Sequence, residues 1–356
     1  MNNLDNLSII HQLDSQKVAE SLMAFPEQLL SGWQTTKTIK LPKTYQNFSE
    51  IISCGMGGSN LATELLRDIY QKEITRPLIL IRNYSLPKFA SKKSLIIINS
   101  YSGNTEETLA CFYQALKIST KIIVITSGGK LLKLAHNYNL PTIKLETKFN
   151  PSQQPRYGVG LQLGVLLRLF KKLNQIKITE QEILITKQKI QLLNERLSPI
   201  NKTRDNLSKQ IAKKLQEKII FLIAGEHLKS NAHILANQIN ESAKQLAIPI
   251  YLPELNHHLL EAFSYPKSSI KNYISLFFTS HLYYSKIKKR LLITNKIFKR
   301  LSIKTLFLNS LADNYLNSTL EILTYNNWIS FYLAIINNKN PADIPLVNLF
   351  KKELKK

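Results

Sequence analysis

Two stretches of the chain alternate short apolar runs with longer amphipathic segments, and this alternation constrains the fold more than any other feature. A short run rich in Ile, Leu and Val suits a strand that is buried on both faces, whereas helical spacing between the runs suits crossover connections. Repeated βαβ units predict an α/β fold with parallel sheets that carry helices on both faces. With 356 residues, the chain is too long for one ordinary core, so we expect two domains.

The alternation also predicts where the elements lie. In the first half we expect strands at 50–54, 78–82, 94–99, 121–126 and 142–145, with helices at 60–71, 105–117, 130–138 and 154–173. In the second half we expect strands at 218–224, 249–252, 274–279 and 305–309, with helices at 230–246, 282–298, 311–336 and 346–354. The predicted organisation is a domain at 1–175, a helical linker at 176–217 and a second domain at 218–356.

A glycine-rich loop, CGMGGS at 54–59, follows the first predicted strand. Its glycines permit unusual backbone angles and close approach by a ligand, and the helix N-terminus beyond them favours an anion. The spacing is not the dinucleotide pattern G-x-G-x-x-G, because residue 60 is Asn. We therefore expect no nicotinamide cofactor. On its own the loop is equally well explained as a tight turn, and it offers Gly58 and Ser59 as phosphate-binding candidates.

A second loop, SYSGNTEE at 100–107, follows the strand expected at 94–99. Ser100, Ser102 and Thr105 bring three hydroxyls to one strand end, and Gly103 allows a tight turn. Hydroxyls and helix N–H groups together can hold a phosphate dianion without a lysine. An ordinary helix cap is the alternative, but three hydroxyls and a glycine so close together favour a phosphate site. A third loop, TSGG at 126–129, either lines the same pocket or is a plain turn.

These motifs resemble a known family. GMGGS, SYSGNTEE and VITSGG, in that order, resemble the first half of a sugar-isomerase (SIS) domain. NESAK at 240–244, ELNHH at 254–258 and the stretch from 340 to 354 resemble the bifunctional phosphoglucose/phosphomannose isomerases. The resemblance covers nearly the whole chain and implies two SIS domains, each a doubly wound, mainly parallel sheet flanked by helices.

The resemblance also implies a reaction. The expected activity is an aldose–ketose isomerase that interconverts glucose 6-phosphate, and mannose 6-phosphate, with fructose 6-phosphate through an enediolate. Proton transfer between C1 and C2 needs a carboxylate, for which the resemblance implies Glu241. A cation stabilises the enediolate, for which it implies Arg156. Ile344 and Pro345 stand where relatives often carry a threonine–proline pair, so the mannose activity is less well supported than the glucose activity.

Ring opening needs an acid/base group near the ring oxygen. A histidine suits this step because its unperturbed pKa is close to neutral pH. The resemblance implies His257, contributed across a homodimer interface, and His258 is the neighbouring alternative. It also implies that Lys351 contacts the ring oxygen, with Lys352 as the alternative one position further on.

Composition narrows the remaining possibilities. The net charge of +24 favours a nucleic-acid partner in principle, but the basic residues are spread along the chain and no nucleic-acid-binding motif accompanies them. We therefore expect no nucleic acid and no membrane as partners. Two cysteines and the lack of a signal-like N-terminus fit a cytoplasmic protein. His and Cys show no metal-ligand spacing, so no metal or other cofactor is expected.

Rival functions remain open at this stage. The main one is a non-catalytic SIS protein that binds a sugar phosphate and regulates a partner, which would keep the serine-rich loop without needing the carboxylate. A glutamine-dependent aminotransferase is less well supported, because no N-terminal domain with a cysteine nucleophile is present.

Overall fold

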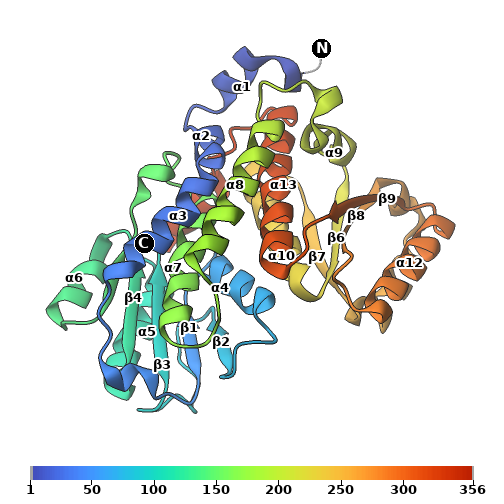
Figure 1. Ribbon diagram of the computed structural model, residues 1–356. Coiled ribbons are helices and arrows are strands. Elements are labelled where there is room, and N and C mark those ends of the chain that lie inside the picture. The colour runs from blue at the N-terminus through green and yellow to red at the C-terminus, as the bar shows by residue number, and fades with distance from the viewer. Residues whose placement is uncertain (1–2, 355–356) are drawn as a thin grey trace. The chain divides into compact units, whose positions relative to one another are not determined.

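The computed structural model describes residues 3–354 (Figure 1). These residues form two compact α/β units. The first, which we call the N-terminal unit, is formed by 24–191; the second, the C-terminal unit, combines 192–354 with residues 3–23. The boundary falls within α8 (Glu180–Leu197). The fold class predicted from the sequence, two parallel sheets flanked by helices, is confirmed.

The N-terminal unit is built on a five-stranded parallel sheet with the order β2-β1-β3-β4-β5. Its strands are β1 (Ile51–Cys54), β2 (Leu78–Ile81), β3 (Leu95–Ser100), β4 (Ile122–Thr126) and β5 (Thr142–Lys144). Its helices are α3 (Phe25–Thr35), α4 (Gly58–Ile69), α5 (Glu106–Ile118), α6 (Gly129–Asn137) and α7 (Val159–Lys172). Every predicted strand of this half lies within two residues of an observed one, because parallel strands buried on both faces leave continuous apolar runs in the sequence.

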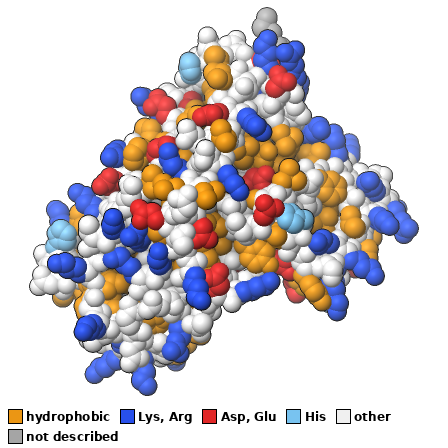
Figure 2. Space-filling model, in the orientation of Figure 1, with side chains coloured by type: hydrophobic (Ala, Val, Ile, Leu, Met, Phe, Trp, Pro, Cys, Tyr) orange, Lys and Arg blue, Asp and Glu red, His pale blue; other side chains and the backbone are white. Residues whose placement is uncertain are grey.

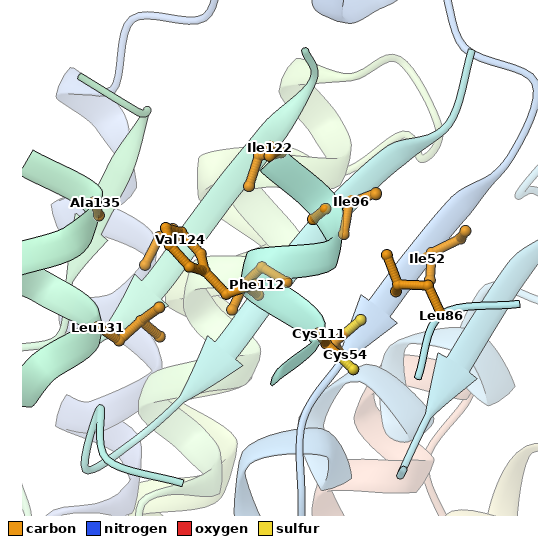
Figure 3. Close-up of a cluster of buried hydrophobic side chains, with 12 residues drawn as sticks. Ile52, Cys54, Leu86, Ile96, Cys111, Phe112, Ile122, Val124, Leu131 and Ala135 are labelled. Carbon is orange, nitrogen blue, oxygen red and sulfur yellow. The ribbon is translucent and has the colours of Figure 1, made fainter. Parts of the chain in front are cut away.

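Helices cover both faces of this sheet. On one face, alternate residues of β1, β3 and β4 pack on α5 and α6 through a buried cluster that includes Ile52, Ile96, Val124 and Phe112 (Figure 3). The opposite face carries Ser53, whose hydroxyl contacts Thr63 of α4 at 3.2 Å. The sheet is therefore doubly wound.

The pairing of α3 with α7 was not predicted. A Cβ on Gly32 would lie 2.0 Å from the Leu161 carbonyl oxygen, and one on Gly164 would lie 2.1 Å from the Leu29 carbonyl oxygen. Only glycine allows the two helix backbones to approach this closely. The close packing holds the first turns of α7, which begins three residues after Arg156.

The C-terminal unit contains a four-stranded parallel sheet with the order β7-β6-β8-β9. Its strands are β6 (Ile219–Gly225), β7 (Ala247–Leu252), β8 (Tyr273–Ser280) and β9 (Lys304–Ser310). Its helices of the second half are α9 (Leu207–Leu215), α10 (Lys229–Gln238), α11 (Leu259–Ala262), α12 (Ser285–Arg300), α13 (Tyr315–Ile336) and α14 (Pro345–Glu353). Within this unit α10 and α13 lie on one side of the sheet and α12 on the other (Figure 1).

The compact units divide the chain differently from the predicted domains. Residues 3–23, with α1 (Leu7–Leu13) and α2 (Val18–Met23), belong to the C-terminal unit and not to the domain predicted at 1–175. Asp5 holds them there: its carboxylate accepts hydrogen bonds from the backbone N–H of Thr203 at 2.8 Å and from the buried ammonium group of Lys209 at 3.3 Å. Part of the predicted linker, α9, likewise packs on α13. These contacts join positions far apart in sequence, where local patterns carry no signal.

Candidate functional site

The strand order of the N-terminal unit creates a site at the carboxyl ends of β1 and β3. The chain runs outward from β1 to β2 on one side and from β3 through β4 to β5 on the other, so the order reverses between β1 and β3. Open α/β sheets bind ligands beyond the strand ends at such a reversal. The glycine-rich loop follows β1 and the serine-rich loop follows β3, so the fold brings the two predicted phosphate-binding loops to this point.

The glycine-rich loop is held by its own side chains. Gly57 has φ 46°, a left-handed conformation that favours glycine, and α4 begins at the next residue. The carboxamide of Asn60 donates to the Gly55 carbonyl at 3.2 Å, so the residue that breaks the dinucleotide pattern anchors the loop. The Ser59 Oγ accepts a hydrogen bond from the Tyr101 N–H at 2.9 Å, which joins this loop to the serine-rich loop.

The serine-rich loop presents its hydroxyls at the N-terminus of α5. Ser100 is buried; its Oγ accepts from the Gly103 N–H at 3.1 Å and donates to the Thr105 Oγ at 3.0 Å. Ser102 is exposed and Thr105 half-buried, so the hydroxyl face reaches solvent. Thr105 is the N-cap of α5 but makes no capping side-chain bond, which leaves the first N–H groups of the helix available to an anion.

Ser127, in the third loop, has a structural role. Its hydroxyl donates to the Tyr101 carbonyl at 2.6 Å, and Gly103 packs so closely on this loop that a Cβ would lie 1.8 Å from the Gly128 carbonyl oxygen. A cavity of about 570 Å³ lies between the third loop and the end of α3, and a second of about 500 Å³ lies along α3. Ser127 lines the larger one, but none of the predicted phosphate-binding residues lines either cavity.

Arg156 lies against the glycine-rich loop. It belongs to the 3₁₀ helix η5 (Pro155–Tyr157) and is buried, at 2% exposure. A Cβ on Gly58 would lie 2.8 Å from the Pro155 carbonyl carbon and 3.0 Å from the Arg156 backbone nitrogen. The guanidinium group donates to the Gln154 Oε1 at 2.9 Å and lies 5.3 Å from the centre of the Tyr157 ring. The fold therefore places a buried arginine beside the glycine-rich loop.

Two polar residues that support the loops were not predicted. Asn99, the penultimate residue of β3, donates its amide to the Ser59 carbonyl. Gln162 is fully buried in α7 and donates to the Gly58 carbonyl at 3.4 Å. A sequence signal for Gln162 did exist, since it is the one uncharged polar side chain in the apolar stretch 159–167. Buried polar side chains of this kind are retained where they have hydrogen-bond partners.

The remaining predicted residues belong to the C-terminal unit. Glu241 lies in η8 (Ile239–Ala243), a π-helical turn that continues α10, and its side chain is half-buried. π-helical turns are rare and occur often at functional sites. The sequence predicted an ordinary helix through 230–246, which is wrong at this turn and at Lys244, where the backbone is left-handed.

His257 follows the 3₁₀ helix η9 (Glu254–Asn256) and is exposed. No hydrogen bond or ion pair involves its side chain within residues 3–354. The imidazole of His258, also exposed, lies 3.6 Å from the carboxylate of Glu254. Of the two candidates, His257 is therefore the one whose side chain has no partner in the described chain.

Lys351 and Lys352 both lie on α14, the last helix, and both are exposed. Every residue of α14 is exposed, and its apolar side chains include Leu346 at 79% and Phe350 at 62%. The structure thus gathers the phosphate-binding candidates and Arg156 in one unit. It distributes Glu241, His257 and Lys351 over three separate elements of the other.

Two further features that would indicate function are metal-binding clusters and membrane-spanning helices. Among residues 3–354, no three His, Cys, Asp or Glu side chains are grouped so as to hold a metal ion. Within the same residues, no helix has both the length and the apolar character needed to cross a membrane.

Known proteins resemble the chain over most of its length. The family described as "Bacterial phospho-glucose isomerase C-terminal SIS domain" matches residues 204–354. The bifunctional phosphoglucose/phosphomannose isomerase of Aquifex aeolicus is 28% identical over 323 residues, which cover 89% of this chain and 93% of the relative. Among solved structures, a hypothetical protein from Thermus thermophilus superposes with a TM-score of 0.76 at 14% identity, covering 98% of this chain and 93% of the other.

A relative from Caldicellulosiruptor bescii carries the assignment. That protein, also a bifunctional phosphoglucose/phosphomannose isomerase, is 30% identical over 341 residues, which cover 94% of this chain and 98% of the relative. Similarity of this extent spans both units. The chain belongs to the bifunctional phosphoglucose/phosphomannose isomerase family.

Proposed function

We propose that this protein is an aldose–ketose isomerase that interconverts glucose 6-phosphate with fructose 6-phosphate, and mannose 6-phosphate with the same ketose. Family membership supports the isomerase over the non-catalytic sugar-phosphate binder. The observation that carries the proposal is the arrangement of the N-terminal unit. Hydroxyls and helix N-termini meet where the strand order reverses, and a buried arginine lies beside them.

In the proposed mechanism the N-terminal unit holds the phosphate group. The hydroxyls of Ser59, Ser100, Ser102 and Thr105, with the backbone N–H at Gly58, donate hydrogen bonds to the dianion. The N-termini of α4 and α5 add a favourable electrostatic field. This binding mode needs no lysine, because hydroxyl and N–H groups hold the phosphate without a flexible cationic side chain.

The chemical steps need three further groups. His257 and Lys351 transfer protons to and from the ring oxygen and the anomeric hydroxyl, which opens the ring. The carboxylate of Glu241 removes the proton from C2 and returns it to C1, through an enediolate whose negative charge Arg156 stabilises. Glucose and mannose differ only at C2, so both aldoses pass through one enediolate.

A coupled assay of fructose 6-phosphate turnover with Glu241→Gln tests the mechanism. The amide cannot accept the proton, so we expect turnover to fall by about 10³-fold or more while a phosphorylated sugar acid still binds. Glu217→Gln, at an exposed glutamate of the same unit, is the matched control and should behave as wild type. If Glu241→Gln turns over as fast as the control, Glu241 is not the catalytic base. If the wild type binds a sugar phosphate but shows no turnover, the protein is a binding protein.

We also propose a homodimer in which His257 completes the site of the partner subunit. Two observations support this: His257 is exposed without a side-chain partner among residues 3–354, and α14 exposes apolar side chains that an interface would cover. Mixing inactive His257→Asn with inactive Glu241→Gln tests it, because each mixed dimer then has one intact site. Statistical mixing gives about one quarter of wild-type activity. No recovery on mixing, with subunit exchange demonstrated, places His257 in its own subunit's site.

The remaining expectations on partners and location form part of this proposal. Lys and Arg side chains are scattered over the visible face of the molecule (Figure 2), and seven of them lie on α12, which carries no Asp or Glu. Because no nucleic-acid-binding motif accompanies these charges, we propose a small anionic substrate, no nucleic acid or membrane as a partner, and a cytoplasmic location. Binding to random duplex DNA at low salt is the direct check, and tight, steeply salt-dependent binding would contradict it.

A further inference from the structure

The backbone around Glu241 is unusual at two successive points. The π-helical turn Ile239–Ala243 widens the end of α10, and Lys244 closes it with φ 54° and ψ 38°. A left-handed conformation is unfavourable for a residue that carries a Cβ, and π-helical hydrogen bonding is rarely more stable than α-helical bonding. A turn of this kind persists only where the surrounding structure holds it in place.

Asn240, the residue before Glu241, makes a two-point contact with the backbone of Ala247. Its Nδ2 donates to the Ala247 carbonyl at 3.0 Å, and its Oδ1 accepts from the Ala247 N–H at 2.8 Å. Ala247 is the first residue of β7, the edge strand that pairs with the inner strand β6. The carboxamide thus replaces a strand neighbour at this position and ties the π-helical turn to the sheet.

Other contacts hold the far side of the turn. The carboxamide of Asn337, at the end of α13, donates to the Ala243 carbonyl at 3.1 Å and to the Gln245 side chain at 2.9 Å. The ammonium group of Lys244 donates to the Asn340 carbonyl at 2.7 Å. Residues on both sides of Glu241 are therefore anchored to α13, to the segment after it and to β7, and Asn240 is the anchor adjacent to the carboxylate.

We propose that Asn240 is a positioning residue for Glu241: its paired hydrogen bonds with Ala247 fix the π-helical turn so that the carboxylate is held where the proton transfer occurs. The inference rests on the proposed function. Asn240 itself touches no reacting atom and acts only through the backbone that it shares with Glu241.

Asparagine suits this role for a chemical reason. Its short side chain offers one donor and one acceptor in a plane, which matches the N–H and C=O of a single residue. Alanine removes both hydrogen bonds. Glutamine keeps both groups but adds a methylene, so it tests placement without removing the pairing. A proton-transfer distance error of about 1 Å can reduce a rate by about 100-fold.

The experiment compares Asn240→Ala and Asn240→Gln with wild type in fructose 6-phosphate formation, using glucose 6-phosphate with hydrogen or deuterium at C2. We expect kcat to fall about 10- to 100-fold in the alanine variant, and by a smaller factor in the glutamine variant. KM should stay within about twofold because the other unit binds the phosphate. The isotope effect on kcat should increase, because slower proton transfer then limits the rate.

Asn237→Ala is the matched control. Asn237 lies one turn earlier, on α10, and within residues 3–354 its side chain hydrogen-bonds only the imidazole of His233, at 3.3 Å. It should match wild type in kcat and isotope effect. A merely structural role of Asn240 lowers kcat through a smaller folded fraction and leaves the isotope effect unchanged; that result, or wild-type kinetics in Asn240→Ala, overturns the inference.

Failure of the inference differs from failure of the proposed function. If Glu241→Gln keeps full turnover, the proposed base is wrong whatever Asn240 does. If Glu241→Gln is inactive while both Asn240 variants keep wild-type kcat and isotope effect, only the positioning role is excluded.

Discussion

The two sheets of this chain have the same strand order at their centre but different chemistry at the point where that order reverses. In each sheet the first strand in sequence, β1 or β6, lies between the second and the third. Ser100 is the last residue of β3, and Ser280 is the last residue of β8. Topology alone thus offers two equivalent crevices for a ligand.

The crevice of the C-terminal unit is occupied by its own side chains. The fully buried hydroxyl of Tyr283 accepts from the Gly225 N–H at 3.1 Å and donates to the Phe278 carbonyl at 3.2 Å. Burial raises the pKa of Tyr283, so the hydroxyl stays protonated and keeps both bonds. Beside it, His227 stacks on Tyr315 with ring centres 4.5 Å apart. Groups that would bind an anion in the other sheet are here satisfied internally.

The difference indicates that the loops, and not the sheet topology, determine which crevice offers unpaired donors to an anion. After β1 the chain has glycines and a helix N-terminus, whereas after β6 it has Glu226 and His227 in a short 3₁₀ turn. In the proposed mechanism the C-terminal unit provides Glu241 from the π-helical turn at the end of α10, away from the strand ends. The N-terminal unit would then bind the phosphate and provide Arg156, and the C-terminal unit would provide the groups that transfer protons.

The largest expected effect comes from removing hydroxyls at the first crevice. The double variant Ser59→Ala/Ser100→Ala should lower kcat/KM about 10²- to 10⁴-fold, because each hydrogen bond to a charged phosphate contributes about 1.5–3 kcal/mol. Ser280→Ala, the matched change at the second crevice, should leave kcat/KM within about twofold. Steady-state kinetics with calorimetric titration of a phosphorylated sugar acid checks both; equal losses in the two variants would show that both crevices bind.

Alanine substitutions at two glycines, Gly58 near the first crevice and Gly225 near the second, also compare the two crevices. Gly58→Ala places a Cβ within 3.0 Å of the Pro155–Arg156 backbone, so we expect Arg156 to shift and kcat/KM to fall about 10- to 100-fold. Gly225→Ala places a Cβ 2.9 Å from a methyl group of Ile287, so it should reduce the free energy of unfolding by about 1–3 kcal/mol with little change in kinetics. A loss of kcat/KM in Gly225→Ala, with wild-type kcat/KM in Gly58→Ala, would contradict phosphate binding at the first crevice.

Some features of this fold leave a clear signal in the sequence, whereas others do not. All nine strands within residues 3–354 lie within two residues of their predicted positions, since each is a continuous apolar run between turn residues. The short N-terminal helices were not predicted. They are stable through packing, as with Trp33 of α3, which is fully buried, and such packing leaves little local signal.

In the candidate site, too, some features were predicted from the sequence and others were missed. The loops around Ser59 and Ser100 were found because hydroxyls, glycines and a helix start share a few consecutive positions. The π-helical turn at Glu241 was missed, because nothing in an amphipathic pattern distinguishes one wide turn from an α-helical one. The pairing of Asn240 with Ala247 depends on where β7 enters the sheet, which is a property of the fold.

Tyr283→Phe tests whether the second crevice is structural. Phenylalanine keeps the ring but leaves the Gly225 N–H and the Phe278 carbonyl without their hydroxyl partner, so we expect the free energy of unfolding to fall by about 1–3 kcal/mol. The value of kcat should not change. Chemical denaturation followed by circular dichroism measures the first quantity and the coupled assay the second. Loss of activity at unchanged stability would mean that the second crevice takes part in catalysis.

The smallest expected effect concerns residues 3–23, the N-terminal segment that packs in the C-terminal unit. Burial alone raises the pKa of Asp5, but hydrogen bonds from Thr203 and Lys209 outweigh it, so the pKa lies below 3.8. A carboxyl whose pKa is lower in the folded state stabilises the fold above its unfolded pKa. That contribution disappears as the pH falls through the lowered value. Because Asp5 is partly exposed, we expect less than about 1 kcal/mol.

Asp5→Asn isolates this contribution. The amide does not titrate, so the variant should be slightly less stable than wild type at pH 7, and the difference should shrink as the pH falls below 3.8. Thermal unfolding at a series of pH values between 7 and about 3 measures it. Hydrogen exchange should locate the change in residues 3–23 and around Thr203, with the first crevice unaffected. A difference that grows as the pH falls has the wrong sign for a stabilising carboxylate, and the absence of any difference would mean that other contacts hold the N-terminal segment.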